Sequence, residues 1–100
     1  MEDDSMLGTT EEKIAEAIIR YLGTTENGSA TIRQIRENLP KFVELNAYDV
    51  RPSKTRDGEK MWEQIVRNVV CHRNVSENTV HDGMLVYIRR GRLTLPDLDE

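Results

Sequence analysis

The chain has 100 residues, of which 37% are hydrophobic and 32% charged, and its formal net charge is −4. This composition is typical of one compact domain, and the length excludes a large enzyme with an elaborate active-site cleft. No apolar run approaches the ~20 residues of a membrane helix, and residues 1–5 are acidic where a secretory signal is basic. We therefore expect a cytoplasmic protein without a membrane partner. The single cysteine, Cys71, fits a reducing compartment, and we expect it to be a core residue.

The negative net charge conceals an uneven distribution along the chain. Residues 1–50 hold five basic and ten acidic side chains, residues 51–92 hold nine and five, and residues 93–100 hold none and three. A basic segment between acidic ends can present a local positive surface, because salt screens each charge within about 8 Å. Ten of the 14 basic residues are arginine, which suits bidentate contacts with phosphate or guanine. The alternative is a solvated basic face with no partner.

The first predicted element is a helix that follows a disordered acidic tail at residues 1–8. Thr9 to Glu12 fits a capping box, in which a threonine and an acid three residues later cap the helix reciprocally. One apolar stripe at helical spacing then consists of Ile14, Ala17, Ile18, Tyr21 and Leu22. Gly23 is the expected stop, and residues 24–29 have the composition of a turn, with a short extended piece expected around Ser29 and Ala30.

A second, shorter helix is predicted from Thr31, where Thr31 and Gln34 form another capping box. Pro40 ends or kinks this helix, because the residue before a proline is pushed out of the helical region. The residues expected to face or cover the core here are Ile32, Ile35, Leu39, Phe42, Val43 and Leu45. Residues 46–59 show no apolar period and contain Arg51, Lys54 and Arg56, so we expect a long basic loop.

The strongest helical pattern begins at Lys60. Apolar pairs four residues apart predict one buried face, formed by Met61, Trp62, Ile65, Val66, Val69 and Val70. We expect Trp62 to be a core aromatic residue. The polar face consists of Lys60, Gln64, Arg67, Asn68 and His72. These side-chain types can hydrogen-bond base edges and phosphates. The alternative is that they form an ordinary solvated surface.

The last predicted element is a β-hairpin over residues 84–95. Residues 84–88 have the β-branched and aromatic content of a strand, residues 89–92 form a tight turn, and residues 93–95 form a return strand that Pro96 ends. Three arginines lie at or beside the tip: Arg89, Arg90 and Arg92.

Three helices followed by a hairpin predict an α+β fold with the element order of a winged helix-turn-helix domain over residues 9–96, followed by an acidic terminus at 97–100. The chain also resembles the winged-helix domains at the amino termini of Mrr-type restriction endonucleases and in some HNH-associated proteins. The resemblance covers roughly residues 11–95. It rests on Trp62, Val66, Arg67, Gly83, Tyr87, Gly91, Leu93 and Thr94.

The resemblance implies a non-enzymatic module that binds double-stranded DNA, from a restriction-type or regulatory protein. Its third helix would lie in the major groove, with the hairpin wing beside it on the backbone or in the minor groove. Arg67 matches the arginine of the family's third-helix motif and is a candidate for base contacts. The helical wheel adds Lys60 and, for base contacts, Gln64 and Asn68. Phosphate contacts are expected from the wing and the loop, namely Lys54, Arg56, Arg89, Arg90 and Arg92, and also from Thr31 and Arg33 at the start of the second helix.

Other interpretations stay open at this stage. Arg67 could instead form an ion pair with Glu63 or another acid. The net acidity also fits a winged helix that contacts a partner protein and binds no DNA. A homodimeric regulator is a further alternative, although the absence of heptads favours a monomer.

Catalysis is not expected, because Glu11, Glu12 and Lys13 only superficially resemble a nuclease motif and no nucleophile or phosphate-loop motif is present. Cys71, His72 and His81 are too few and too irregular for a zinc site, so we expect no metal and no cofactor.

Overall fold

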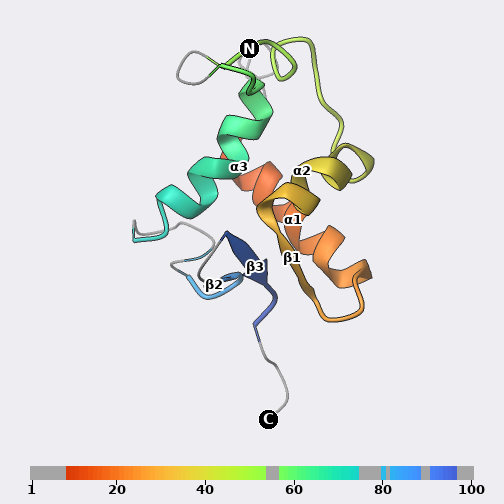
Figure 1. Ribbon diagram of the computed structural model, residues 1–100, viewed down its shortest axis with the longest axis vertical. Coiled ribbons are helices and arrows are strands. Elements are labelled where there is room, and N and C mark those ends of the chain that lie inside the picture. Colours follow the sequence, from red (N-terminus) through yellow and green to blue (C-terminus); the bar gives the residue numbers. More distant parts are fainter. Residues whose placement is uncertain (1–8, 54–56, 75–79, 81, 89–90, 97–100) are drawn as a thin grey trace.

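The computed structural model describes residues 9–53, 57–74, 80, 82–88 and 91–96, and both predicted tails, 1–8 and 97–100, lie outside them. The described elements are, in chain order, α1 (Glu11–Thr24), β1 (Ser29–Thr31), α2 (Ile32–Asn38), the 3₁₀ turn η2 (Leu39–Lys41), α3 (Met61–Cys71), β2 (Val86–Ile88) and β3 (Arg92–Thr94). The strands form an antiparallel sheet in the order β1-β3-β2. The predicted α+β class is confirmed, and the arrangement is compatible with a winged-helix layout (Figure 1).

Helix α1 begins one residue later than its sequence predicts. Its N-cap is Thr10, whose Oγ1 accepts a hydrogen bond from the Lys13 amide at 3.2 Å. Thr9 is not the cap because its amide and hydroxyl both donate to the Asp49 carboxylate. The predicted stop at Gly23 is also wrong, since the helix continues to Thr24. The Thr24 hydroxyl donates to the Tyr21 carbonyl, and the Thr25 hydroxyl donates to the Leu22 carbonyl.

Helix α2 begins where its sequence predicts. The Gln34 backbone amide donates to Thr31 Oγ1 at 3.1 Å, and the Thr31 backbone amide donates to the side-chain Oε1 of Gln34 at 3.0 Å, which completes the capping box. Thr31 is also the last residue of β1, so this one residue turns the chain from strand to helix. Pro40 does not end the helical path at once, because the chain tightens into η2 around it.

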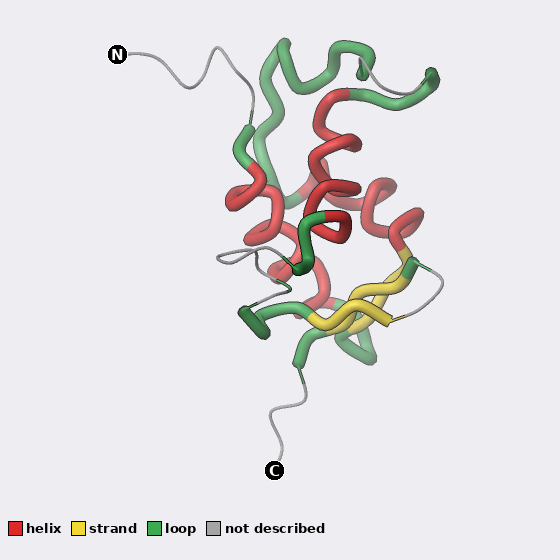
Figure 2. The backbone as a smooth tube through the Cα atoms, turned by 90° about the vertical axis from the view of Figure 1, so that its left-hand side faces the viewer, coloured by secondary structure: helices red, strands yellow, loops and turns green. Residues whose placement is uncertain are grey.

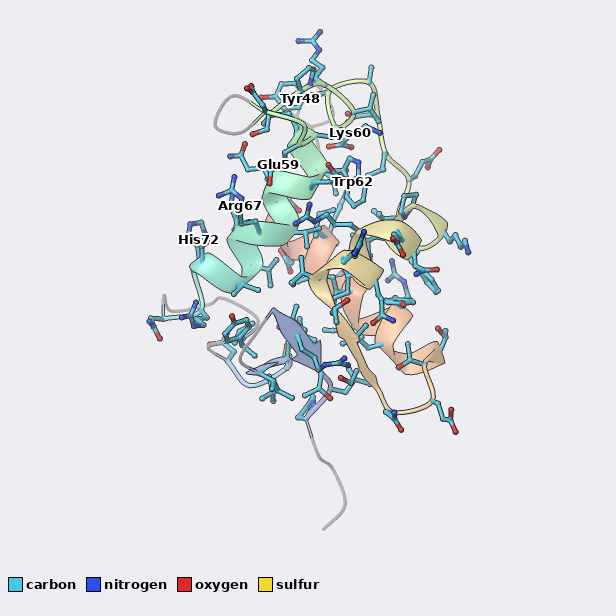
Figure 3. All side chains as sticks on the ribbon, in the orientation of Figure 1. Tyr48, Glu59, Lys60, Trp62, Arg67 and His72 are labelled. Atoms are coloured by element: carbon cyan, nitrogen blue, oxygen red, sulfur yellow. The ribbon has the colours of Figure 1, made fainter. Side chains whose placement is uncertain are left out.

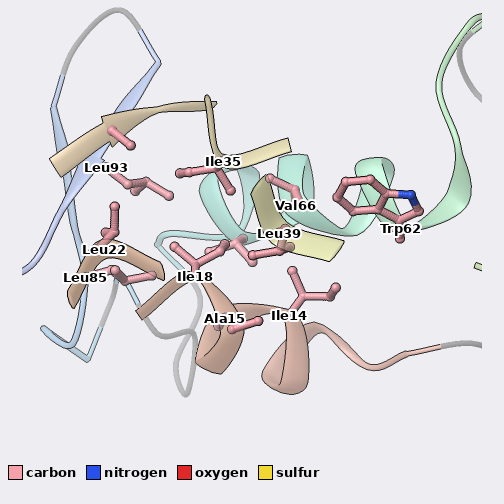
Figure 4. Packing of buried hydrophobic residues seen from close by; sticks show 13 residues of the cluster. Ile14, Ala15, Ile18, Leu22, Ile35, Leu39, Trp62, Val66, Leu85 and Leu93 are labelled. Carbon is pink, nitrogen blue, oxygen red and sulfur yellow. The ribbon is translucent and has the colours of Figure 1, made fainter. Parts of the chain in front are cut away.

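The hydrophobic core lies between the three helices and the sheet (Figure 4). Its buried side chains are Ile14, Ala15, Ala17, Ile18, Leu22, Ala30, Ile35, Leu39, Trp62, Val66, Val69, Leu85 and Leu93. The core assignment of Trp62 is confirmed, since the residue is 4% exposed. The prediction for Cys71 is wrong: the residue is exposed, because two helical steps of about 100° carry it to the far side from Val69.

The sheet has one face toward the helices and one toward solvent. Ala30, Leu93 and Tyr87 pair across the three strands and pack on the core, whereas Val86 and Ile88 of the edge strand are exposed. The described parts of the segment before α3, residues 46–53 and 57–59, lie at the end of the helical layer that is away from the sheet (Figure 2). None of the described helices has both the length and the apolar character to cross a membrane.

The turn of the hairpin is tied to α2. Gly91 has φ +73°, a left-handed conformation that favours glycine, and its carbonyl accepts a hydrogen bond from the Ile32 amide at 2.7 Å. The hairpin is also tied to the end of α3, because the Arg73 guanidinium lies 4.8 Å from the centroid of the Tyr87 ring. These contacts fix the position of the hairpin relative to both helices.

Candidate nucleic-acid interface

The 46–59 loop holds the amino-terminal end of α3. The Met61 amide donates to the Arg51 carbonyl at 2.8 Å, and the Trp62 amide donates to the Asp49 carbonyl at 3.0 Å. The first amides of a helix have no partner within the helix itself. Here the loop supplies carbonyl acceptors, so these two amides are not available to a phosphate group. The described residues of the segment, 46–53 and 57–59, form a loop, as predicted, and their backbone is joined to the helix that they precede.

Asp49 organises this loop from the inside. Its carboxylate is buried and accepts hydrogen bonds from the Thr9 amide and hydroxyl, both at 2.7 Å, and from the Asn46 amide at 2.8 Å. The Asp49 amide donates in turn to Asn46 Oδ1. One acid therefore joins the segment before α1 to the loop before α3, although 40 residues separate Thr9 from Asp49.

Arg67, the predicted base-reading arginine, forms a bidentate ion pair with Glu59. Its Nε lies 3.0 Å from Oε2, and its Nη2 lies 2.9 Å from Oε1. The Glu59 side chain is 3% exposed and that of Arg67 is 24% exposed. The hydrogen bond to Glu59 raises the pKa of the Arg67 guanidinium, so the arginine is charged at every physiological pH. The ion-pair alternative is confirmed, with Glu59 as the acid in place of Glu63.

The other predicted α3 residues lie in different surroundings. Gln64 is half-buried, and its Oε1 accepts a hydrogen bond from the Ser53 hydroxyl at 2.7 Å. Asn68 is half-buried, and no side-chain hydrogen bond of Asn68 occurs within the described part of the chain. Lys60 is exposed and precedes the helix as its N-cap residue. Gln64 and Arg67 therefore both contact the loop, through Ser53 and Glu59.

Only part of the predicted wing falls within the described residues. Arg92 Nη1 donates to the Ser29 hydroxyl at 3.0 Å, so this arginine spans β3 and β1 on the solvent face of the sheet. Arg89 and Arg90 lie outside the described residues, as do Lys54 and Arg56 of the loop. Thr31 is occupied as the cap of α2, while Arg33 is exposed beside Glu37, with Nε 3.9 Å from Oε2.

A cleft that the sequence did not indicate separates α2 from the start of α3. Its volume is about 610 Å³. The residues that line it are Arg33, Arg36, Glu37, Pro40, Lys60, Trp62 and Glu63. Figure 3 shows Trp62 on the side of α3 nearer α2, and Glu59 and Arg67 on the other side. Sequence reasoning missed Arg36, although its spacing of three from Arg33 places both arginines on neighbouring positions of one helix face.

Within the described residues, no group of three side chains is arranged to hold a metal ion. His72 lies instead with Nδ1 3.1 Å from Glu11 Oε1, which joins the end of α3 to the start of α1. No protein-family model, curated protein sequence or solved structure matches this chain. Its function must therefore be inferred from its own residues and their arrangement.

Proposed function

We propose that this chain is a winged-helix module that binds double-stranded DNA. In this proposal α3 enters the major groove and the β2–β3 hairpin contacts the backbone as a wing. One observation supports it. Helix α3 is followed by a hairpin that carries Arg92, and the contact between Arg73 and Tyr87 holds the end of α3 beside the hairpin. The resemblance to Mrr-type and HNH-associated winged helices points to the same function, within a restriction-type or regulatory protein.

Electrostatic attraction would supply most of the affinity. Lysine and arginine side chains that neutralise phosphates release bound counterions, so binding of this kind weakens steeply with salt. The proposed phosphate contacts are Lys54, Arg56, Lys60, Arg89, Arg90 and Arg92. They lie in the segment 51–92, which holds the excess of positive charge. Helix α1, which belongs to the acidic half of the chain, would face away from the DNA.

Base reading is assigned first to Gln64 and Asn68. An amide side chain can both donate to and accept from a base edge, and a good bidentate pair contributes about 1–3 kcal/mol of discrimination. Arg67 is a weaker candidate because reaching a base would break both of its hydrogen bonds to Glu59. That would leave a buried carboxylate without its partner, which is costly. In this proposal Arg67 mainly positions the loop that precedes α3.

The second candidate function is a winged helix that contacts a partner protein and binds no DNA. Two exposed apolar residues of the edge strand favour it, Val86 at 40% and Ile88 at 43% exposure. An edge strand leaves backbone groups unpaired, and apolar side chains beside them suit a protein contact. The DNA proposal remains first because it uses α3 and the arginine-bearing hairpin together. We also propose a monomer in preference to a homodimer.

The experiment that tests the proposal is a map of backbone amide shifts in the ¹⁵N-labelled protein as a random-sequence duplex is added. DNA binding by α3 and the wing predicts shifts at Gln64, Asn68 and Arg92 that grow with duplex concentration. The control residues are those of α1, whose amides should not move. Shifts confined to α1, or no shifts at low salt, would contradict the proposal and favour the protein-contact function.

A further inference from the structure

We propose that the cleft between α2 and the start of α3 binds a phosphate group, held by Arg36 and Lys60. The inference deepens the proposed function. A DNA phosphate as the ligand rests on that proposed function, whereas inorganic phosphate tests the cleft independently of it. The cleft opens between two elements, with Arg33, Arg36 and Pro40 on one wall and Lys60 and Trp62 on the other. Its volume of about 610 Å³ is that of a small-molecule site.

The charge of the cleft favours an anion. Three cations and two carboxylates line it, which leaves one positive charge in excess. Both carboxylates are already engaged: Glu63 Oε1 accepts from the Lys60 amide at 2.9 Å, and Glu37 lies beside Arg33. Neither the Arg36 guanidinium nor the Lys60 ammonium forms an ion pair with any residue that the structure describes.

Arg36 carries a polar atom that lacks an acceptor. Its Nε is buried and makes no hydrogen bond among the described residues. A buried donor without an acceptor costs free energy, and the cost is greater when the group is charged. Because Nε itself is buried, a phosphate in the cleft would bind the terminal nitrogens of the same guanidinium, whose planar fork matches the geometry of phosphate. A guanidinium with an unpaired nitrogen at the cleft wall favours an anionic ligand of this chemistry.

A phosphate group can use both walls of the cleft. Its oxygens surround a tetrahedral centre, so Arg36 on α2 and Lys60 before α3 can bind different oxygens at the same time. The positive end of the α3 dipole adds a favourable field at the Lys60 side. The Met61 and Trp62 amides are bonded to the loop, so side chains and not helix amides would hold the ligand.

Trp62 provides an intrinsic reporter for this cleft. It is the only tryptophan of the chain, and it lines the cleft from the α3 side. The experiment follows Trp62 fluorescence and its indole N–H resonance during titration with inorganic phosphate, and separately with a random-sequence duplex. Chloride replaces phosphate in a parallel titration at equal ionic strength, so that general screening is subtracted.

Variants separate the cleft from charge in general. Arg36→Gln and Lys60→Gln should each weaken phosphate binding about tenfold or more, because each removes a charged hydrogen bond. Arg36→Lys keeps the charge and should bind better than Arg36→Gln. Lys13→Gln is the matched control, since Lys13 is exposed on α1 and does not line the cleft, and it should change binding less than about twofold. Circular dichroism establishes that every variant folds.

The outcomes distinguish this inference from the proposed function. A Trp62 response to both phosphate and duplex that Arg36→Gln abolishes supports a DNA phosphate in the cleft. A Trp62 response to phosphate, with a labelled duplex whose anisotropy does not change, supports the cleft with a small phosphate ester as its source and contradicts DNA binding. Duplex binding that Arg36→Gln leaves unchanged, with no Trp62 response to phosphate, overturns the cleft and leaves DNA binding intact. No Trp62 response to phosphate together with unchanged duplex anisotropy overturns both.

Discussion

Glu59 and Arg67 form a two-bond ion pair, Nε to Oε2 at 3.0 Å and Nη2 to Oε1 at 2.9 Å, that joins the end of the 46–59 loop to the middle of α3. The Ser53 amide donates to the Glu59 carbonyl at 2.6 Å, so the same residue also closes the loop on itself. Arg67 of α3 therefore has a structural role in the absence of any nucleic acid.

Replacing Glu59 should test that structural role. Glu59→Gln removes the carboxylate and leaves a partly buried guanidinium with weaker acceptors. We therefore expect the free energy of unfolding to fall by about 1–3 kcal/mol. Urea denaturation followed by circular dichroism measures this change. Glu44→Gln, at an exposed position, is the control and should stay within about 0.5 kcal/mol. Equal stability of the two variants would show that the pair contributes nothing.

Replacing Asp49 should release the loop from both ends. Asp49→Ala deletes the acceptor of two bonds from Thr9 and one from Asn46, and we expect a loss of about 2–4 kcal/mol of stability. Hydrogen exchange at Thr9 and Trp62 should accelerate, because the loop carries both contacts. Asp57→Ala, at an exposed loop position, is the control. Unchanged exchange at Trp62 in Asp49→Ala would contradict this linkage.

Trp62→Ala should unfold or strongly destabilise the domain. A buried aromatic side chain replaced by alanine costs about 3–5 kcal/mol through lost burial and the resulting cavity. That is a large share of the stability of a domain of this size. Thermal denaturation of Trp62→Ala beside Trp62→Phe gives the comparison, with Phe retaining more stability. A folded Trp62→Ala protein that lost only ligand binding would reassign Trp62 from core to binding surface.

Arg90→Ala should weaken binding to all DNA sequences alike. Loss of one phosphate contact lowers the slope of log K against log salt by about one unit. Fluorescence anisotropy at four salt concentrations measures the slope for the wild type, for Arg90→Ala and for the control Lys13→Ala. A slope that stays the same in Arg90→Ala would remove Arg90 from the interface.

Asn68→Ala should reduce discrimination between DNA sequences without reducing general affinity. A lost base contact costs about 1–3 kcal/mol on the preferred site and little on random duplex. Selection from a random library with each protein, followed by anisotropy on the selected site, measures both effects. Asn27→Ala, in the exposed turn after α1, is the control. Equal losses on selected and random duplexes would make Asn68 a backbone contact.

The helices and the two strands of the hairpin were predictable in type because their signals are local. The predicted bounds of the strands are wrong, since β2 begins at Val86 and not at residue 84, and β3 runs from Arg92 to Thr94 although Arg92 was expected in the turn. Paired apolar residues at helical spacing placed α3, and the Thr31 and Gln34 capping box placed the start of α2. The sequence could not distinguish Thr9 from Thr10 as the cap of α1, because Asp49 decides between them from 40 residues away. The prediction for Cys71 is wrong because cysteine is usually a buried residue type, whereas this position on the helical wheel lies opposite the buried Val69.

The candidate site was less predictable because it depends on contacts between elements. The composition of the 46–59 segment, with three basic and three acidic residues, gives no indication that Asp49 and Glu59 are buried and organise the loop. The α2–α3 cleft also has no sequence signature, since Arg36 and Lys60 line one cleft only because α2 packs beside the start of α3. Helical geometry does not indicate the Glu59–Arg67 pair either, because eight residues of continuous helix would separate the two by about 12 Å along the axis, and the pair forms only because Glu59 lies before the helix.

The most direct test of the account is the anisotropy of a labelled random-sequence duplex titrated with the whole chain from low to physiological salt. The account predicts saturable binding that weakens steeply as salt rises, because several lysine and arginine contacts to phosphate are lost together. A folded protein that leaves the anisotropy unchanged even at the lowest salt would contradict DNA binding and assign the fold to protein contacts.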